Sequence, residues 1–167
     1  MKPVAALALA LVAASCGDDV RRTHYAGGKP WSELHYAGGR PNGTLTTWHE
    51  NGQKAREGTY VDGLEHGTWR VWGEDGTLLL QAEYQRGRAH GAWSEWWSNG
   101  KPKFHGTYHD GRPDGTWAEF WQDGQRAIEA RYAGGQPDGE TRRYGKDGAL
   151  VVIDTYEKGT FVSRRRP

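Results

Sequence analysis

The chain has 167 residues, and its 22 basic and 21 acidic side chains leave a formal net charge of +1. A charge this close to zero argues against a general binder of nucleic acid or of acidic membranes, because both need a basic surface. The single cysteine excludes an intramolecular disulfide and a cysteine-rich metal site. Nine tryptophans and eight tyrosines make aromatic rings the main material for any core.

Residues 1–15 have the features of a bacterial lipoprotein signal peptide. Lys2 precedes an apolar run over residues 4–14, which is shorter than the roughly 20 residues that a membrane-spanning helix needs. The sequence Ala13-Ala14-Ser15-Cys16 resembles the lipobox, whose cysteine is acylated and becomes the first residue of the mature protein. We expect residues 16–18 to form the lipidated N-terminus and a short linker. The alternative is an ordinary signal peptide followed by a chance cysteine.

Acylation of Cys16 would determine where the protein resides. It would account for the one unpaired thiol of an exported chain, and two or more acyl chains anchor a protein stably whereas one does not. We therefore expect a lipid-anchored protein of the bacterial cell envelope. Gly17 follows the cysteine, and in Gram-negative bacteria an aspartate there would favour the inner membrane, so the outer membrane is preferred.

From residue 19 to residue 162 the sequence repeats every 24 residues without an insertion. With positions numbered from Gly43, glycine at position 10, tyrosine at position 18 and glycine at position 21 occur in every copy. A period of this length is the signature of a repeat array. The six copies are 19–42, 43–66, 67–90, 91–114, 115–138 and 139–162, and residues 163–167 form a basic tail.

Each copy contains two turn signals. Positions 9 and 10 are Gly-Gly, Asn-Gly or Asp-Gly, which are typical of two-residue type I′ turns because both residues need positive φ. Positions 20 and 21 suit the same turn, although Arg86 and Lys158 fit it less well. Turn signals at this spacing exclude helices. The sequence predicts an all-β fold, an elongated single-sheet antiparallel β-meander of about six 24-residue hairpin repeats and about 12 strands.

Hairpin pairing predicts which side chains lie opposite each other. Position 3, which is tryptophan in three copies, lies opposite a small residue at position 16, and the tyrosine at position 18 lies opposite a glycine at position 1. Rings laid over glycine cover exposed backbone. The aromatic residues at position 6 point to the other face. Both faces of the sheet therefore carry aromatic side chains.

Residues 91–115 contain the pattern Gly-x-Trp-x-x-Trp-x-x-Asn-Gly, followed by Gly-x-Tyr-x-x-Gly-Arg-Pro-Asp-Gly. This pattern resembles MORN repeats, and most closely the variant found in bacterial YwqK-family proteins, which carry the label of antitoxins. The resemblance covers residues 19–162. It implies an array of stacked hairpins that binds or scaffolds other molecules, and it brings no catalytic residue.

The sequence contains no pattern of an enzyme site. No glycine-rich phosphate loop or nucleophile elbow occurs, and no insertion interrupts the copies to build a pocket. His66 and His90 occupy one position of neighbouring copies, about 10 Å apart, which is too far to share a zinc ion at about 2 Å. We expect no catalytic residue, no metal and no cofactor. A carbohydrate enzyme that uses carboxylates on an aromatic surface is the enzymatic alternative.

These observations predict a non-enzymatic, membrane-anchored protein-binding or scaffolding module. The expected partner is another protein, with the chain itself monomeric. A glycan or peptidoglycan is the second expected ligand, and an antitoxin-like role as the partner of a toxin is a further alternative. Nucleic acid is not expected.

Four tryptophans of the fourth and fifth copies form the candidate binding patch. Positions 3 and 7 share a face of the sheet about 13 Å apart along a strand. Position 7 varies between copies, so the fold does not require tryptophan there, and exposed tryptophans mark interaction sites. The alternative is that the two tryptophans at position 7 cover Pro102 and Arg126. The patch consists of Trp93, Trp97, Trp117 and Trp121.

The lipoprotein hypothesis predicts the chemistry of the mature N-terminus. Intact-mass spectrometry of the protein from membranes should show that the chain begins at Cys16 and carries lipid. Cys16→Ser should release the chain from the membrane, because no acyl group remains to anchor it. An unmodified cysteine, or a mature chain that begins elsewhere, would contradict the hypothesis.

Overall fold

The computed structural model describes residues 19–167, and all of the regular structure in this range is β-strand. No helix capable of crossing a membrane occurs among these residues. The predicted signal peptide and the acylation of Cys16 concern residues outside the described range. The strands are β1 (Asp19–His24), β2 (Pro30–Ala37), β3 (Arg40–Trp48), β4 (Lys54–Val61), β5 (Leu64–Trp72), β6 (Leu78–Gln85), β7 (Arg88–Trp96), β8 (Pro102–His109), β9 (Arg112–Phe120), β10 (Arg126–Ala133), β11 (Gln136–Pro137), β12 (Gly139–Tyr144), β13 (Leu150–Glu157) and β14 (Thr160–Arg165).

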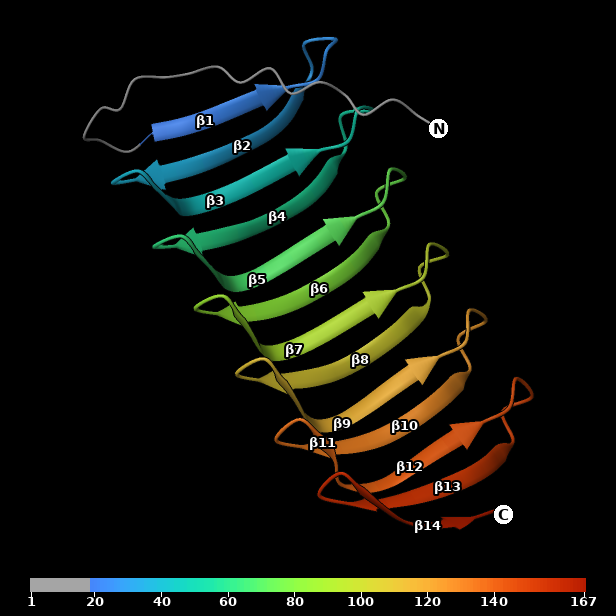
Figure 1. Ribbon diagram of the computed structural model, residues 1–167. Coiled ribbons are helices and arrows are strands. Elements are labelled where there is room, and N and C mark those ends of the chain that lie inside the picture. Colours follow the sequence, from blue (N-terminus) through green and yellow to red (C-terminus); the bar gives the residue numbers. More distant parts are fainter. Residues whose placement is uncertain (1–18) are drawn as a thin grey trace.

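The strands form one antiparallel sheet in which neighbours in sequence are neighbours in space (Figure 1). The two-residue strand β11 pairs with β10 just before β12 takes over as its partner. The sheet is a single layer, and β1 and β14 lie at its opposite ends. This topology confirms the predicted all-β meander of hairpins. Strand β14 continues through Arg165 and so includes part of residues 163–167, which the sequence predicts to be a basic tail.

The turns at positions 20 and 21 have the predicted type I′ backbone. Both residues have positive φ, as Asp110 at 48° and Gly111 at 78° illustrate. Arg86, the less suitable residue, adopts the same conformation with a φ of 51°. Successive turns on this edge are joined by backbone hydrogen bonds, such as the one that Gly111 N donates to Ala89 O at 2.8 Å.

The turns at positions 9 and 10 differ from the prediction, because only the glycine has positive φ. In the fourth copy Gly100 has a φ of 77°, whereas Asn99 does not enter the left-handed region. Gly100 N donates to Trp97 O and Trp97 N donates to Lys101 O, both at 2.8 Å. This is the three-residue loop that ends in a left-handed glycine. The Asn99 side chain favours it by accepting a hydrogen bond from Lys101 N at 3.0 Å.

A β-bulge after each of these loops restores the predicted pairing. In the fourth copy Trp96 pairs with Pro102 but Glu95 pairs with Phe104, so Lys103 is the extra residue. The bulge offsets the longer loop, and Trp93 still lies opposite Gly106 as predicted. The bulge also changes which side chains of the returning strand share a face, and this affects the candidate site below.

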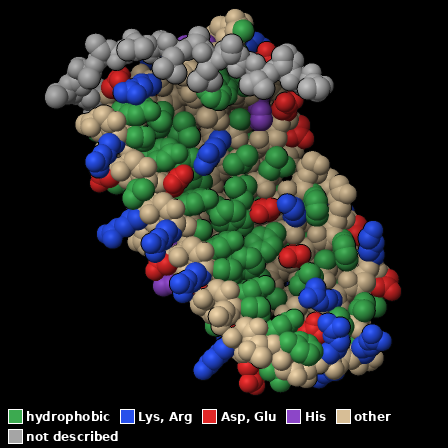
Figure 2. Space-filling model, viewed as in Figure 1, with side chains coloured by type: hydrophobic (Ala, Val, Ile, Leu, Met, Phe, Trp, Pro, Cys, Tyr) green, Lys and Arg blue, Asp and Glu red, His purple; other side chains and the backbone are tan. Residues whose placement is uncertain are grey.

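The core is a ladder of alternating tyrosine and tryptophan rings on one face of the sheet. Figure 2 shows hydrophobic side chains gathered in a band that crosses the strands. Trp69 is 1% exposed, and the guanidinium of Arg56 lies 4.3 Å from its ring centroid. The ring-centroid distances along the ladder are Tyr60–Trp69 5.0 Å, Trp69–Tyr84 6.3 Å, Tyr84–Trp93 6.1 Å, Trp93–Tyr108 5.2 Å, Tyr108–Trp117 5.1 Å and Trp117–Tyr132 5.1 Å.

Two of the tryptophans lie over glycines, but over those of the preceding hairpin. A Cβ atom at Gly58 would lie 2.1 Å from Trp69 Cδ2, and one at Gly106 would lie 2.8 Å from Trp117 Cε2. The predicted partner of Trp69 within its own hairpin is Ala82, and the two residues do pair. Each ring has a small residue on either side, and it lies on the glycine because only there is no methyl group in the way.

The last copy carries a buried ion pair at position 16, where the four preceding copies have glycine or alanine. Position 16 is Asp154, which is fully buried. Arg164 on β14 donates from Nε to Oδ1 at 2.6 Å and from Nη2 to Oδ2 at 3.0 Å, while Arg143 Nε lies 3.7 Å from Oδ2. Hydrogen bonds from Arg164 lower the pKa of the Asp154 carboxyl below its ordinary 3.8, and the charges of both arginines act in the same direction. Burial of the carboxylate raises this pKa but is outweighed.

The contact between Gly58 and Trp69 predicts a costly substitution. Gly58→Ala places a methyl group inside the buried indole, and overpacking of this kind lowers the free energy of unfolding by about 1–3 kcal/mol. Urea denaturation followed by circular dichroism measures the change. Gly27→Ala is the matched control, because its new Cβ would meet nothing within 4 Å. Equal stabilities of the two variants would show that the ring does not rest on Gly58.

The Asp154 pair predicts a stabilisation that disappears in acid. Because the folded-state pKa is lowered, the pair stabilises the protein above the unfolded-state pKa of about 3.9, and this contribution is lost as pH falls toward the folded-state value. Asp154→Asn should lower the melting temperature at pH 6, and the difference from the unmodified protein should shrink below about pH 4. Asp62→Asn in an exposed turn should leave the profile unchanged. A difference for Asp154→Asn that is independent of pH would contradict this account.

Candidate functional site

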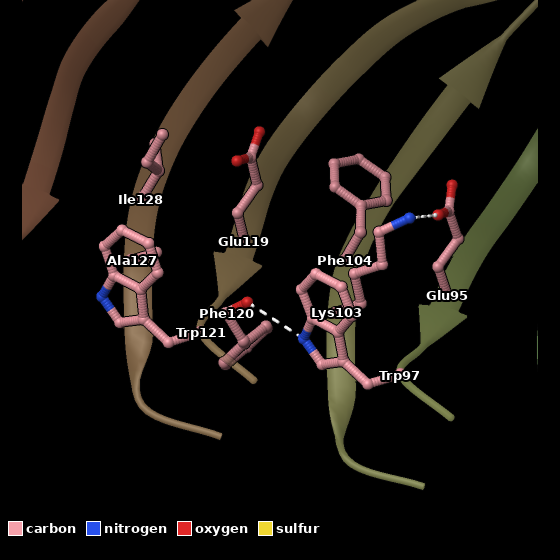
Figure 3. A pocket seen from close by; sticks show the side chains of 9 residues that line it. All are labelled: Glu95, Trp97, Lys103, Phe104, Glu119, Phe120, Trp121, Ala127 and Ile128. Carbon is pink, nitrogen blue, oxygen red and sulfur yellow. Dashed lines mark hydrogen bonds and ion pairs between the residues drawn. The ribbon is translucent and has the colours of Figure 1, made fainter. Parts of the chain in front are cut away.

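An apolar groove spans β7 to β10 (Figure 3). It has a volume of about 440 Å³ and is open to solvent. Trp97 and Trp121 lie at the loop ends of β7 and β9, with their indoles side by side at one end of the groove. The groove is lined by Glu95, Trp97, Lys103, Phe104, Glu119, Phe120, Trp121, Ala127 and Ile128.

In three copies the side chain at position 7 links neighbouring hairpins. Trp97 Nε1 donates to Phe120 O at 3.2 Å, and Tyr25 Oη donates to Trp48 O at 2.8 Å in the first copy. His49 Nε2 lies 2.9 Å from Trp72 O in the second copy. Trp97 therefore has a structural contact in addition to any binding role. The contact is not required in every copy, because position 7 is glycine at Gly73 and Gly145.

Trp121 differs from Trp97 in this respect. Its Nε1 atom is buried and has no hydrogen-bond partner within residues 19–167. The ammonium of Lys146, an exposed residue of the next loop, lies 5.7 Å from the indole centroid. A buried donor without a partner costs free energy, so the Trp121 side chain is not placed by its own hydrogen bonding.

Lys103 and Ala127, at position 13, lie beside these indoles. The sequence predicts that the neighbouring position 12, occupied by Pro102 and Arg126, lies there instead. Pro102 pairs with Trp96, and the bulge brings Lys103 into the groove, with its ammonium 5.4 Å from the centroid of the Trp97 ring. Ala127 occupies the same position in the next copy and also lines the groove. The alternative that the tryptophans cover Pro102 and Arg126 depends on a hairpin without a bulge.

Trp93 and Trp117 lie beside the groove and belong to the ring ladder. Trp93 Nε1 donates to Glu95 Oε1 at 3.0 Å, and the ring of Trp117 packs edge-on against Phe104 with a centroid distance of 4.7 Å. The structure thus brings Trp97 and Trp121 together in the groove and connects the other two tryptophans to it through Glu95 and Phe104.

The two carboxylates of the groove have different surroundings. Glu95 accepts hydrogen bonds from Lys103 Nζ at 2.8 Å and from Trp93 Nε1. Burial of Glu95 opposes its ionisation, but these hydrogen bonds and the Lys103 charge outweigh burial and lower the pKa of Glu95. Glu119 is exposed and makes no side-chain hydrogen bond or ion pair with any residue in the range 19–167.

Sequence reasoning did not identify Phe104, Ile128 or Lys103 as groove residues. Phe104 and Ile128, at position 14, pair with Glu95 and Glu119, and this agrees with the predicted pairing. Lys103, at position 13, is the extra residue of the bulge, so an uninterrupted alternation of faces assigns it incorrectly. A signal was present, because Glu at position 5 together with Trp at position 7 occurs only in the fourth and fifth copies. A metal ion has no evident place, since no group of three His, Cys, Asp or Glu suitable for one occurs in the described part of the chain.

The family described as MORN repeat variant matches three consecutive segments, residues 41–62, 65–86 and 89–110. Each segment covers one hairpin, the first β3–β4, the second β5–β6 and the third β7–β8. No curated protein matches the chain. The match bears out the resemblance to MORN repeats for these copies. MORN repeats suggest a protein that binds or scaffolds other molecules.

Proposed function

We propose that this chain is a lipid-anchored protein of the bacterial envelope that binds a partner protein through the Trp97–Trp121 groove. The observation that carries the proposal is the groove itself, an apolar hollow lined by two indoles. Exposed apolar patches mark interaction sites, and tryptophan is enriched among the residues that dominate binding energy. The proposed role is non-enzymatic.

Anchoring at Cys16 would present the groove away from the membrane. The proposed anchor precedes β1 by a short linker, whereas the groove is built on β7 to β10. Neighbouring strands are about 4.8 Å apart, so the groove lies about 30 Å or more along the sheet from β1. The first copies would then act as a spacer between the outer membrane and the bound partner.

A glycan is the second candidate ligand, and a specific observation favours it. Trp97 and Trp121 occupy equivalent positions one hairpin apart, hence about 10 Å, with two carboxylates beside them. Stacked sugar rings with hydroxyls hydrogen-bonded to carboxylates would suit this arrangement. The likeness to YwqK-family proteins suggests an antitoxin-like role, which is one form of protein binding, with a toxin as the partner.

The double substitution Trp97→Ala, Trp121→Ala tests the groove. We expect capture of the partner to fall at least about tenfold, equivalent to about 1.4 kcal/mol. We expect the free energy of unfolding to fall by less than the 3–5 kcal/mol typical of a buried large-to-small change, because both indoles are only half-buried. Capture is measured by cross-linking the full chain to envelope proteins and, separately, by binding to purified peptidoglycan.

The matched control is Trp48→Ala, Trp72→Ala, which removes two indoles from the opposite face and should preserve capture. Loss of peptidoglycan binding alone would favour the glycan candidate. If the groove variant captures its partners as well as the unmodified chain does, the binding surface lies elsewhere and the proposal is wrong.

A further inference from the structure

The groove contains the same pair of side chains twice. Glu95 and Trp97 on β7 and its loop correspond to Glu119 and Trp121 on β9 and its loop, one repeat later (Figure 3). The residue that faces each pair from the returning strand differs. It is Lys103 in the fourth copy and Ala127 in the fifth.

In the fourth copy the glutamate and the tryptophan together hold an ammonium group. Lys103 Nζ donates to Glu95 Oε2 at 2.8 Å and lies 5.4 Å from the centroid of the Trp97 ring. An ion pair combined with a cation–π contact is a favourable arrangement for a lysine head group. The alkyl part of Lys103 runs through the groove beside Phe104.

In the fifth copy the corresponding place has no cation. Ala127 is buried and ends at its methyl group, and Glu119 has no ion-pair partner anywhere in residues 19–167. Phe104 and Ile128 lie opposite Glu119 on the two neighbouring strands and form apolar walls. Arg143, beyond Ile128, is engaged with Asp154 at 3.7 Å.

The indole of Trp121 already attracts a cation at its loop end, where Lys146 Nζ lies 5.7 Å from the ring centroid. Lys146 makes no ion pair with Glu119 or with any other carboxylate of the described residues. The Glu119 carboxylate and the apolar walls therefore remain open to a cation from outside the chain, beside a ring whose contact with Lys146 shows that it accepts an ammonium group.

We propose that the Glu119–Trp121 half of the groove binds a lysine side chain of the partner protein. The ammonium would donate to the Glu119 carboxylate and lie against the Trp121 indole, and the four-carbon stem would pack between Phe104 and Ile128. Lys103 in the preceding copy shows this arrangement within the chain itself. The inference rests on the proposed function, because it supplies the chemistry by which that groove recognises a protein.

The test uses the full chain in detergent micelles with ¹⁵N-labelled tryptophan. The probe is Nα-acetyl-lysine methylamide, and the control probe is Nα-acetyl-norleucine methylamide, which has a similar stem without the ammonium. We expect the lysine probe to shift the Trp121 indole N–H resonance in a saturable way, with an affinity at least about tenfold above that of norleucine.

Three variants make the result specific. Glu119→Gln should lose the preference for lysine over norleucine, because the exposed carboxylate is gone while the fold is kept. Ala127→Lys should shift the Trp121 resonance without any probe and then abolish lysine binding, since an internal ammonium fills the site as Lys103 does. Glu157→Gln, at an exposed glutamate outside the groove, is the matched control and should leave the Trp121 response intact.

Equal responses to the two probes would overturn the inference, as would a lysine response that survives both Glu119→Gln and Ala127→Lys. That failure is distinguishable from failure of the proposed function. If the lysine site fails while Trp97→Ala, Trp121→Ala still abolishes partner capture, the groove binds its partner by other chemistry. If lysine binds Trp121 as expected but the double variant captures partners normally, the proposed function is wrong and the lysine site stands.

Discussion

A single-layer sheet has to cover its own backbone with side chains, and the rest of this structure depends on how the ring ladder does so. No helix or second sheet packs on the described strands. Tyrosine and tryptophan therefore alternate along one face in edge-on or tilted contacts, and two of the tryptophans lie directly on glycines. Each ring bridges two hairpins, so the ladder joins the copies as well as shielding them. The stability of each copy then depends chiefly on its neighbours, as in other repeat arrays.

The two long edges of the sheet have different turns, and this difference produces the groove. One edge has two-residue turns with both φ values positive, and the strands that these turns join also change register, as between His105 and Thr107 on β8. The other edge has three-residue loops followed by a bulge, which adds a side chain to the ladder face at position 13. Where that side chain is Lys103 it fills the space beside an indole, and where it is Ala127 it leaves the space open.

The end of the array has a buried ion pair as well as a last ring contact, in which Tyr156 and Phe161 lie 5.8 Å apart between ring centroids. Thr141 stands where the ladder would have a further tryptophan, and opposite it Asp154 is buried beneath Arg164 and Arg143. A buried carboxylate is tolerated only when it is well paired, and the two arginines provide that pairing. The last strand beyond it is exposed along its whole length, with Phe161 and Val162 each about half exposed. The ion pairs of Asp154 thus end the ladder, while β14 remains an edge strand with no neighbour on its outer side in the described sheet.

The sequence by itself determined the strand order, the positions of all turns and the face of each ring, because glycine at fixed intervals leaves few backbone choices and side chains alternate along a strand. The pairing of Trp93 with Gly106 followed from that spacing alone. The type of the loop at Asn99-Gly100 did not follow from the sequence, because the same dipeptide suits a two-residue turn and a three-residue loop. Hydrogen bonds to Trp97 and Lys101 decide between them.

The bulge that accompanies this loop leaves no mark in the sequence. Only the tertiary structure therefore decided that Lys103 and Ala127 face the indoles, and that Trp69 rests on Gly58 of the preceding hairpin instead of on Ala82. These contacts depend on side-chain packing between copies, which the period of the repeat does not specify.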